Sequence, residues 1–215
     1  MTTLSAEALY DEGMRYLNGN GVKKNMKKAI DCFEQSIAIG SSESKRELGL
    51  ILLGDGLLHT DAADLSGLSA ELEREKRGEQ LLEEAAAEGD ISAKKWFIKK
   101  HNHYLFAYFI GCFPNISLYL EEKKKCKIAK KYKEELIELG DLDTLYDKAL
   151  SSFSPDKKLI LELAEQGYAP AEYTMGMWYL KGMNYEKDLT KAKQWLSCSS
   201  EHGNEEAKKV LASLS

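Results

Sequence analysis

The sequence predicts an all-α fold, a solenoid of about five helix–turn–helix repeats closed by a C-terminal capping helix. The first observation is an internal repeat, because residues 8–40 recur with drift as residues 171–203. Aligning Gly13 with Gly176 brings a tyrosine, a Lys–Ala pair and two further glycines into register. The second observation is that only three of 215 residues are proline, which suits a nearly all-helical chain. Repetition of this kind is typical of stacked helical hairpins.

Composition argues against several classes of function. Hydrophobic residues make up 43% of the chain, which is enough for a buried core. The net charge of -5 argues against general binding of nucleic acids or anionic membranes, which favour a basic surface. The N-terminal residues lack the pattern of a signal peptide, and no apolar run is long enough to span a bilayer. We therefore expect a cytoplasmic protein whose four cysteines, which lack paired spacing, stay reduced.

Each feature of the first repeat has a reason in local structure. Gly19 is predicted to end the first helix, because glycine accepts the positive φ of a helix C-terminus. Asn25 is the predicted N-cap of the second helix, whose buried stripe includes Phe33. Small residues at Gly13 and Ala29 allow the two helices to approach each other closely.

The pattern of leucine, glycine, tyrosine, Gly-x-Gly-Val, Lys-Ala, an aromatic residue, a small pair and a final glycine resembles the Sel-one-like repeat family. That family is related to the tetratricopeptide repeats. The resemblance is strongest in the first and last units, and the last unit departs from it at residues 183–185, where the Gly-Val of the turn is missing. It implies an α-solenoid that binds other proteins.

The middle of the chain is more divergent, but its second helices keep the register. The five second helices are predicted to end at Gly40, Gly89, Gly140, Gly167 and Gly203, and Leu81 takes the aromatic position of the second unit. We place the units at 4–40, 41–89, 90–140, 141–167 and 168–203, with a polar cap at 204–215. Unequal spacing implies insertions at 55–75 and 99–124, and a short first helix within 142–153.

The resemblance also implies where a partner binds. In such solenoids the first helices line a concave groove, and positions near the helix glycine face it. Ile98 and Ala149 replace that glycine in the third and fourth units. Carried onto this chain, the predicted partner-binding residues are Tyr10, Met14, Asn18, Arg46, Leu50, Lys95, Lys99, His103, Tyr146, Tyr173, Met177 and Lys181. Aromatic residues, methionine and arginine are typical of interface cores.

Other candidate sites have simpler interpretations. His101, His103 and Cys112 could form a metal site, but the two histidines point to different sides of a helix and no second pair is evident. Residues 19–24 resemble a phosphate loop only superficially, because they follow a helix and lack the Gly-Lys-Ser/Thr ending. The basic segment 121–135 suits a solvated helix face, docking of an acidic protein or, less well, nucleic acid. The aromatic segment 106–113 suits a buried extra helix or an exposed patch.

We therefore expect a non-enzymatic scaffold or adaptor that binds a partner protein in its groove, with no cofactor, no catalytic residue and no metal. Two alternatives stay open. An acidic chain with divergent repeats also suits an immunity protein that sequesters a bacterial toxin. An enzyme on a helical scaffold would instead need a closed polar pocket with a perturbed acid or base.

Overall fold

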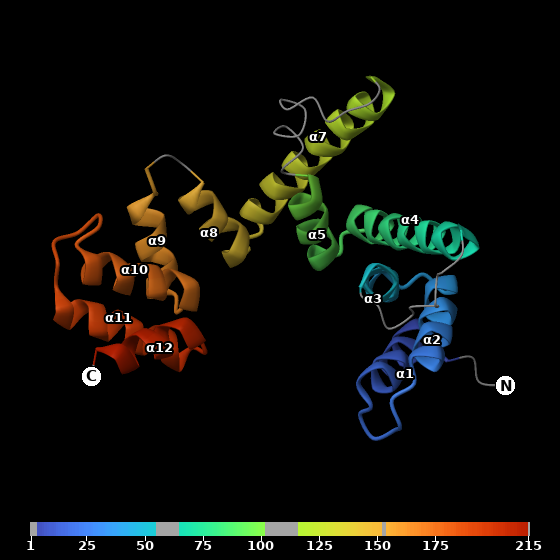
Figure 1. The fold of residues 1–215 in the computed structure, drawn as a ribbon, viewed down its shortest axis with the longest axis horizontal. Coiled ribbons are helices and arrows are strands. Elements are labelled where there is room, and N and C mark those ends of the chain that lie inside the picture. Colours follow the sequence, from blue (N-terminus) through green and yellow to red (C-terminus); the bar gives the residue numbers. More distant parts are fainter. Residues whose placement is uncertain (1–3, 55–64, 102–115, 152–153, 215) are drawn as a thin grey trace. The chain divides into compact units, whose positions relative to one another are not determined.

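The computed structural model describes residues 4–54, 65–101, 116–151 and 154–214. Within these ranges the chain forms eleven α-helices and no β-strand, which confirms the all-α prediction (Figure 1). The helices are α1 (Ala6–Asn18), α2 (Met26–Ala38), α3 (Ser42–Leu53), α4 (Leu65–Ala87), α5 (Ile91–His101), α7 (Ile116–Glu138), α8 (Leu142–Leu150), α9 (Lys157–Glu165), α10 (Ala169–Lys181), α11 (Leu189–Glu201) and α12 (Glu205–Ser213).

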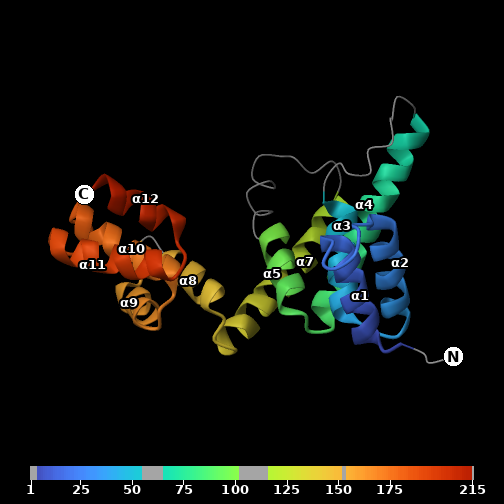
Figure 2. The ribbon, with the colours of Figure 1, turned by 90° about the horizontal axis from the view of Figure 1, so that it is seen from below.

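The chain divides into two compact units, residues 1–133 and residues 134–215. Unit 1 holds α1 to α5 and most of α7, and unit 2 holds the end of α7 and the helices α8 to α12. In unit 2, α10 packs beside α11 and α11 beside α12 (Figures 1 and 2). The five predicted helix pairs and the closing helix are therefore confirmed. The limits of the individual repeat units stay a prediction.

The helix ends follow the chemistry expected from the sequence. The predicted cap Asn25 accepts a hydrogen bond at its Oδ1 from the backbone N of Lys28, at 3.0 Å. Gly19 ends α1 with a φ of 81°. The five glycines that follow the second helices also have positive φ, from 75° at Gly140 to 107° at Gly89.

In the last repeat, where the Gly-Val of the turn is missing, other residues form the turn between α10 and α11. Asn184 takes a φ of 62°, a conformation that asparagine tolerates better than most residues. The ring of Tyr185 then stacks on Tyr179 with 4.9 Å between centroids, and the Nζ of Lys157 donates to the carbonyl oxygen of Asn184 at 3.0 Å. These contacts hold the turn between α10 and α11 in place of the missing valine.

Glycines allow the helices of a pair to touch. A Cβ added at Gly13 would lie 2.6 Å from the Cε1 atom of Phe33, and one at Gly49 would lie 2.8 Å from the Cγ atom of Leu82. The residues that face these glycines lie four positions after the small residue of the second helix, as Phe33 does after Ala29 and Leu82 after Gly78. Leu81, the predicted aromatic position of the second repeat, corresponds to Trp195 of the last repeat and is buried in a cluster with Phe33 and Leu48.

The predicted insertions are partly helical. Leu65 to Glu75 of the first insertion form the beginning of α4, and residues 116–124 of the second form the beginning of α7. The aromatic segment 106–113 lies outside the described residues. The short first helix predicted within 142–153 is α8, which has nine residues.

His101 provides a pH-dependent element of unit 1. The side chain is 1% exposed, its ring centroid lies 4.4 Å from that of Phe97, and its Nδ1 lies 3.1 Å from an oxygen of Glu122. Burial lowers the pKa of His101 and outweighs the raising effect of Glu122, while the charges of Lys125 and Lys100 lower it further. The folded chain therefore favours a neutral ring.

We predict that stability falls as this histidine is forced to take up a proton. The unfolded chain binds this proton at higher pH than the folded chain does. The neutral ring therefore contributes its full stability above the unfolded pKa of about 6.5, and this stability is lost as pH falls toward the lower pKa of the folded chain. Melting temperatures of the native chain and His101→Gln, taken from pH 8 to pH 5, test this. The native curve should fall more steeply, and parallel curves would contradict the prediction.

Candidate partner-binding surface

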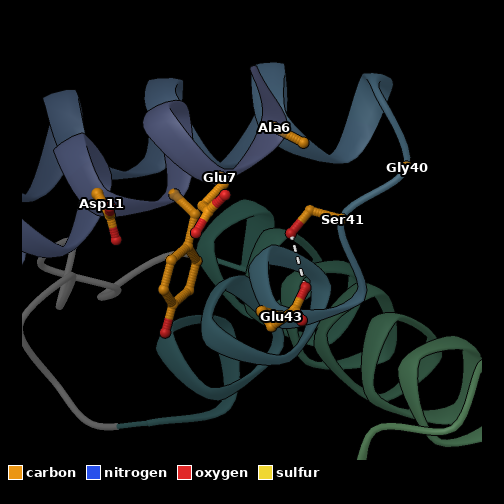
Figure 3. Close-up of a pocket in the computed structure, with 7 residues that line it drawn as sticks. Ala6, Glu7, Asp11, Gly40, Ser41 and Glu43 are labelled. Atoms are coloured by element: carbon orange, nitrogen blue, oxygen red, sulfur yellow. Dashed lines mark hydrogen bonds between the residues drawn. The ribbon is translucent and has the colours of Figure 1, made fainter. Parts of the chain in front are cut away.

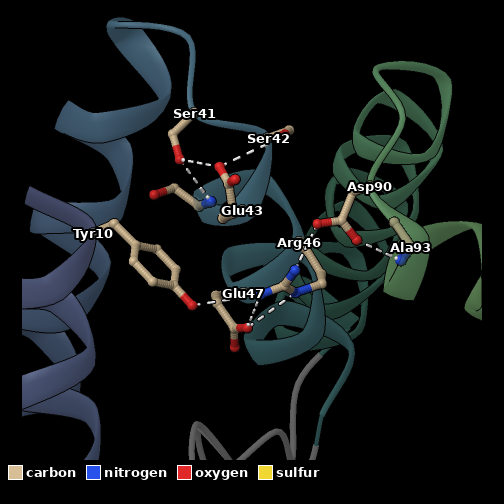
Figure 4. A network of polar contacts seen from close by, with 9 residues as sticks. Tyr10, Ser41, Ser42, Glu43, Arg46, Glu47, Asp90 and Ala93 are labelled. Atoms are coloured by element: carbon tan, nitrogen blue, oxygen red, sulfur yellow. Dashed lines mark hydrogen bonds and ion pairs between the residues drawn. The ribbon is translucent and has the colours of Figure 1, made fainter. Parts of the chain in front are cut away.

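The predicted surface is built from matched positions on neighbouring first helices. The Nη2 of Arg46 donates to the hydroxyl of Tyr10 at 3.4 Å and links α3 to α1 (Figure 4). In unit 2 the hydroxyl oxygens of Tyr146 and Thr174 lie 2.7 Å apart and link α8 to α10. Each unit therefore has its own set of predicted residues along adjacent first helices.

Arg46 forms ion pairs with residues of the same chain. Its guanidinium pairs with Asp90 at 2.6 Å and with Glu47 at 2.9 Å, and its side chain is 18% exposed (Figure 4). Asp90 also accepts a hydrogen bond from the backbone N of Ala93 at 2.7 Å, at the start of α5. Arg46 thus connects three first helices of unit 1, and its contact with Tyr10 helps to position that ring.

A pocket opens beside this network, between the N-terminal half of α1 and the start of α3 (Figure 3). Its volume is about 450 Å³. Three of its residues are carboxylates and one is aromatic. The lining residues are Ala6, Glu7, Tyr10, Asp11, Gly40, Ser41 and Glu43.

The electrostatics of the pocket favour a cation. Glu43 Oε2 accepts hydrogen bonds from the hydroxyls of Ser41, at 3.2 Å, and Ser42, at 3.5 Å. The pKa of Glu43 is lowered by its own backbone N–H and by these two serines, against the opposing effect of burial, so the carboxylate stays charged. Burial raises the pKa of Tyr10 and keeps its phenol neutral. A negative pocket with an aromatic wall suits a lysine or arginine side chain.

The predicted partner-binding residues differ in how far they reach solvent. Asn18, Leu50, Lys99 and Lys181 are exposed, and Leu50 is 42% exposed. The half-buried ones are Tyr10, Met14, Arg46, Lys95, Tyr146, Tyr173 and Met177. His103 lies outside the described residues. Tyr10 lies in unit 1, and Tyr173 lies in unit 2.

The remaining candidates have structural roles where they are described. The superficial phosphate loop at residues 19–24 follows the C-terminal end of α1, which is the wrong end of a helix for a phosphate. His101 is engaged with Glu122, whereas His103 and Cys112 lie outside the described residues. In the described part of the chain, no group of three histidine, cysteine or acidic side chains could hold a metal ion. No described helix is long and apolar enough to cross a bilayer.

Sequence reasoning missed the carboxylates of the pocket. Glu7 and Asp11 lie one helical turn apart on α1, and Glu43 follows the N-cap Ser41 in the first turn of α3. Acidic residues in a first turn are ordinarily explained by the helix dipole. The signal that could have found the pocket was the turn at residues 40–41, which brings the start of α3 beside α1.

Comparison with known families supports the same architecture. The family model of the Sel1 repeat matches residues 6–41 and 169–204. These are the first and last units, where the repeat pattern is clearest. Comparison with curated proteins finds no match.

Comparison with solved structures finds a similar fold over nearly the whole length of the chain. A Sel1 repeat protein from Oxalobacter formigenes is 20% identical, with a TM-score of 0.62, and the match covers 98% of this chain and 78% of that one. A protective antigen of uropathogenic Escherichia coli with an SLR fold, c5321, is also 20% identical, with a TM-score of 0.35 and coverage of 97% and 48%. At this identity the first likeness supports the fold alone.

Proposed function

We propose that this chain, a Sel1-repeat protein, is a non-enzymatic scaffold that binds a partner protein along the first helices of its two units. Sel1 repeats generally act as protein-interaction scaffolds. The observation that carries the proposal is the half-exposed surface on α1 and α3, where Tyr10 and the exposed Leu50 accompany an open, acid-lined pocket. Interface cores favour such aromatic and apolar residues with a polar rim.

The charge of the pocket indicates the chemistry of the contact. Glu7, Asp11 and Glu43 attract a cationic side chain, and the ring of Tyr10 adds a flat face against which its alkyl part can pack. We therefore expect the partner to present a basic segment to α1 and α3.

Charge substitutions on matched exposed leucines test this proposal. Leu50→Glu places a carboxylate on the first-helix surface, whereas Leu72→Glu makes the same change on α4, where Leu72 is 62% exposed. With the partner identified by co-purification from native cells, Leu50→Glu should weaken binding by about tenfold or more. Leu72→Glu should leave binding within about twofold.

A second pair of variants applies the test to unit 2. Lys181→Glu changes an exposed residue of α10, and Lys158→Glu changes one on α9 whose side chain is 87% exposed. Binding should fall for the first and not for the second. Equal effects of the first-helix and second-helix changes, with helicity intact in all four variants, would overturn the proposed surface.

An immunity role is a second candidate, favoured by the acid-lined pocket, because a basic toxin would complement it. Co-expression with the product of the adjacent gene separates the two roles. Tight one-to-one capture that abolishes a toxic activity supports immunity, whereas weaker contacts with several proteins support an adaptor.

A further inference from the structure

The acid-lined pocket between α1 and α3 carries three carboxylates, and the described residues supply no ion-pair partner for any of them. Glu7 and Asp11 form no ion pair and no side-chain hydrogen bond within the described part of the chain. Glu43 accepts its hydrogen bonds from the neutral hydroxyls of Ser41 and Ser42. The pocket therefore has a negative charge that a partner can neutralise.

Arg46 lies beside the pocket, but other carboxylates already neutralise it. Its guanidinium pairs with Asp90 at 2.6 Å and with Glu47 at 2.9 Å (Figure 4). Two negative charges thus offset the single positive charge of Arg46. Its contact with the pocket is made through the hydroxyl of Tyr10, at 3.4 Å. The positive charge of Arg46 therefore leaves the negative charge of the pocket largely intact.

Local helix structure does not account for all three acids. Glu7 and Glu43 lie in the first turns of α1 and α3, where the helix dipole favours negative charge. Asp11 lies one turn further along α1, and like charges four residues apart repel each other. A terminal repeat needs a polar outer surface, but an uncharged side chain serves that purpose equally well. The last repeat, which matches the same family model, has Thr174 at the position of Asp11, so the repeat itself does not require a carboxylate there.

The arrangement of the carboxylates indicates the kind of cation. In the described part of the chain, no group of three acidic, histidine or cysteine side chains could hold a metal ion, so the carboxylates of the pocket are not arranged around one ion. The volume of about 450 Å³ is in the range of sites for organic ligands. A guanidinium is planar, has five N–H donors and stacks on aromatic faces, whereas a lysine ammonium is a compact charge with three donors. Several separated carboxylates and the ring of Tyr10 therefore suit a guanidinium better.

We propose that the pocket between α1 and α3 binds an arginine side chain of the partner and prefers it to lysine. This inference rests on the proposed function, because it names the residue type that the first-helix surface of unit 1 accepts. Glu7 and Asp11 supply acceptors from α1, and Glu43 supplies acceptors from α3 (Figure 3). The ring of Tyr10 packs against the face of the guanidinium.

The decisive variant is Glu7→Gln with Asp11→Asn in the full-length chain. It removes two negative charges from the pocket and keeps the size of both side chains, so helicity should be unchanged. The matched control is Glu12→Gln with Asp31→Asn, at residues of α1 and α2 that do not line the pocket. Both double variants change the net charge of the chain equally, so a difference between them cannot come from net charge.

The binding probes are three fluorescent nine-residue peptides of glycine, serine and leucine that differ only at the central residue. That residue is arginine, lysine or citrulline, which is the uncharged isostere of arginine. Measured by anisotropy in about 100 mM salt, the native chain should bind the arginine peptide about threefold more tightly than the lysine peptide and about tenfold more tightly than the citrulline peptide. The pocket variant should weaken binding of the arginine peptide by about tenfold, and the control variant by less than twofold.

The proposal is overturned if no peptide binds, if the native chain binds the three peptides equally, or if the two double variants weaken the arginine peptide equally. Tighter binding of spermidine, a small cation without a guanidinium, would overturn it as well. None of these results decides the proposed function, which the Leu50→Glu variant tests with the partner itself. Capture of the partner through Leu50 without any arginine preference would refute this inference alone.

Discussion

Replacing Phe33 by alanine is expected to lower the free energy of unfolding of unit 1 by about 3–5 kcal/mol. Phe33 is 0% exposed, and its ring fills the space left by Gly13 on the facing helix. The ring of Tyr10 also lies 6.0 Å from it. Truncation therefore removes both the burial of an aromatic ring and the main contact between α1 and α2. Urea denaturation followed by circular dichroism measures the loss.

Phe33→Leu is the matched control for this cavity. Leucine occupies the equivalent position in two other pairs, as Leu82 against Gly49 and Leu196 against Gly176. It should therefore be accepted with a loss of about 1.5 kcal/mol or less. A Phe33→Ala loss no larger than that of Phe33→Leu would contradict the assigned contact.

The second large effect is expected at Gly176. A Cβ added there would lie 2.7 Å from the Cγ of Leu196 and 3.2 Å from its backbone N, so a side chain forces α10 and α11 apart. Gly176→Val should destabilise unit 2 by about 3 kcal/mol, at the upper end of the usual cost of overpacking. A drop in melting temperature of the variant measures it.

Ala149 supplies the control for Gly176, because it occupies the same repeat position on α8 and is 1% exposed with its methyl group in place. Ala149→Gly removes a methyl group and adds backbone freedom, so it should cost only about 1 kcal/mol. The double variant Gly176→Val with Leu196→Ala should lose less stability than the sum of the two single variants, because the clash is with that leucine. An unchanged melting temperature for Gly176→Val would refute the close approach.

Much of the fold could be predicted because it depends on local chemistry. Positive φ at the helix-ending glycines and the cap at Asn25 are properties of single residues and their neighbours. Which of Leu81 and Leu82 faces Gly49 could not be predicted in the same way. Both side chains are buried, and hydrophobicity alone does not distinguish the one that contacts the neighbouring helix at Gly49.

The candidate surface could be predicted only in part. The register of the repeat predicted that Tyr10 and Leu50 lie on first helices, and both side chains are at least partly exposed in the structure. It gave no sign that Arg46 would pair with Asp90, because that contact joins residues 44 positions apart. The acid-lined pocket was missed for a similar reason, since Glu7 and Glu43 meet only after α1 and α3 have packed.

Site-specific photo-cross-linking in native cells tests partner binding by the first helices most directly. Leu50 lies on the first helix of a pair, α3, and Leu72 lies on its second helix, α4, and both side chains are exposed. A photoreactive phenylalanine analogue is placed at one position or at the other. We predict a discrete cross-linked partner from position 50 that is absent from position 72. Cross-links of equal yield from both positions, or a discrete product only from position 72, would contradict the account.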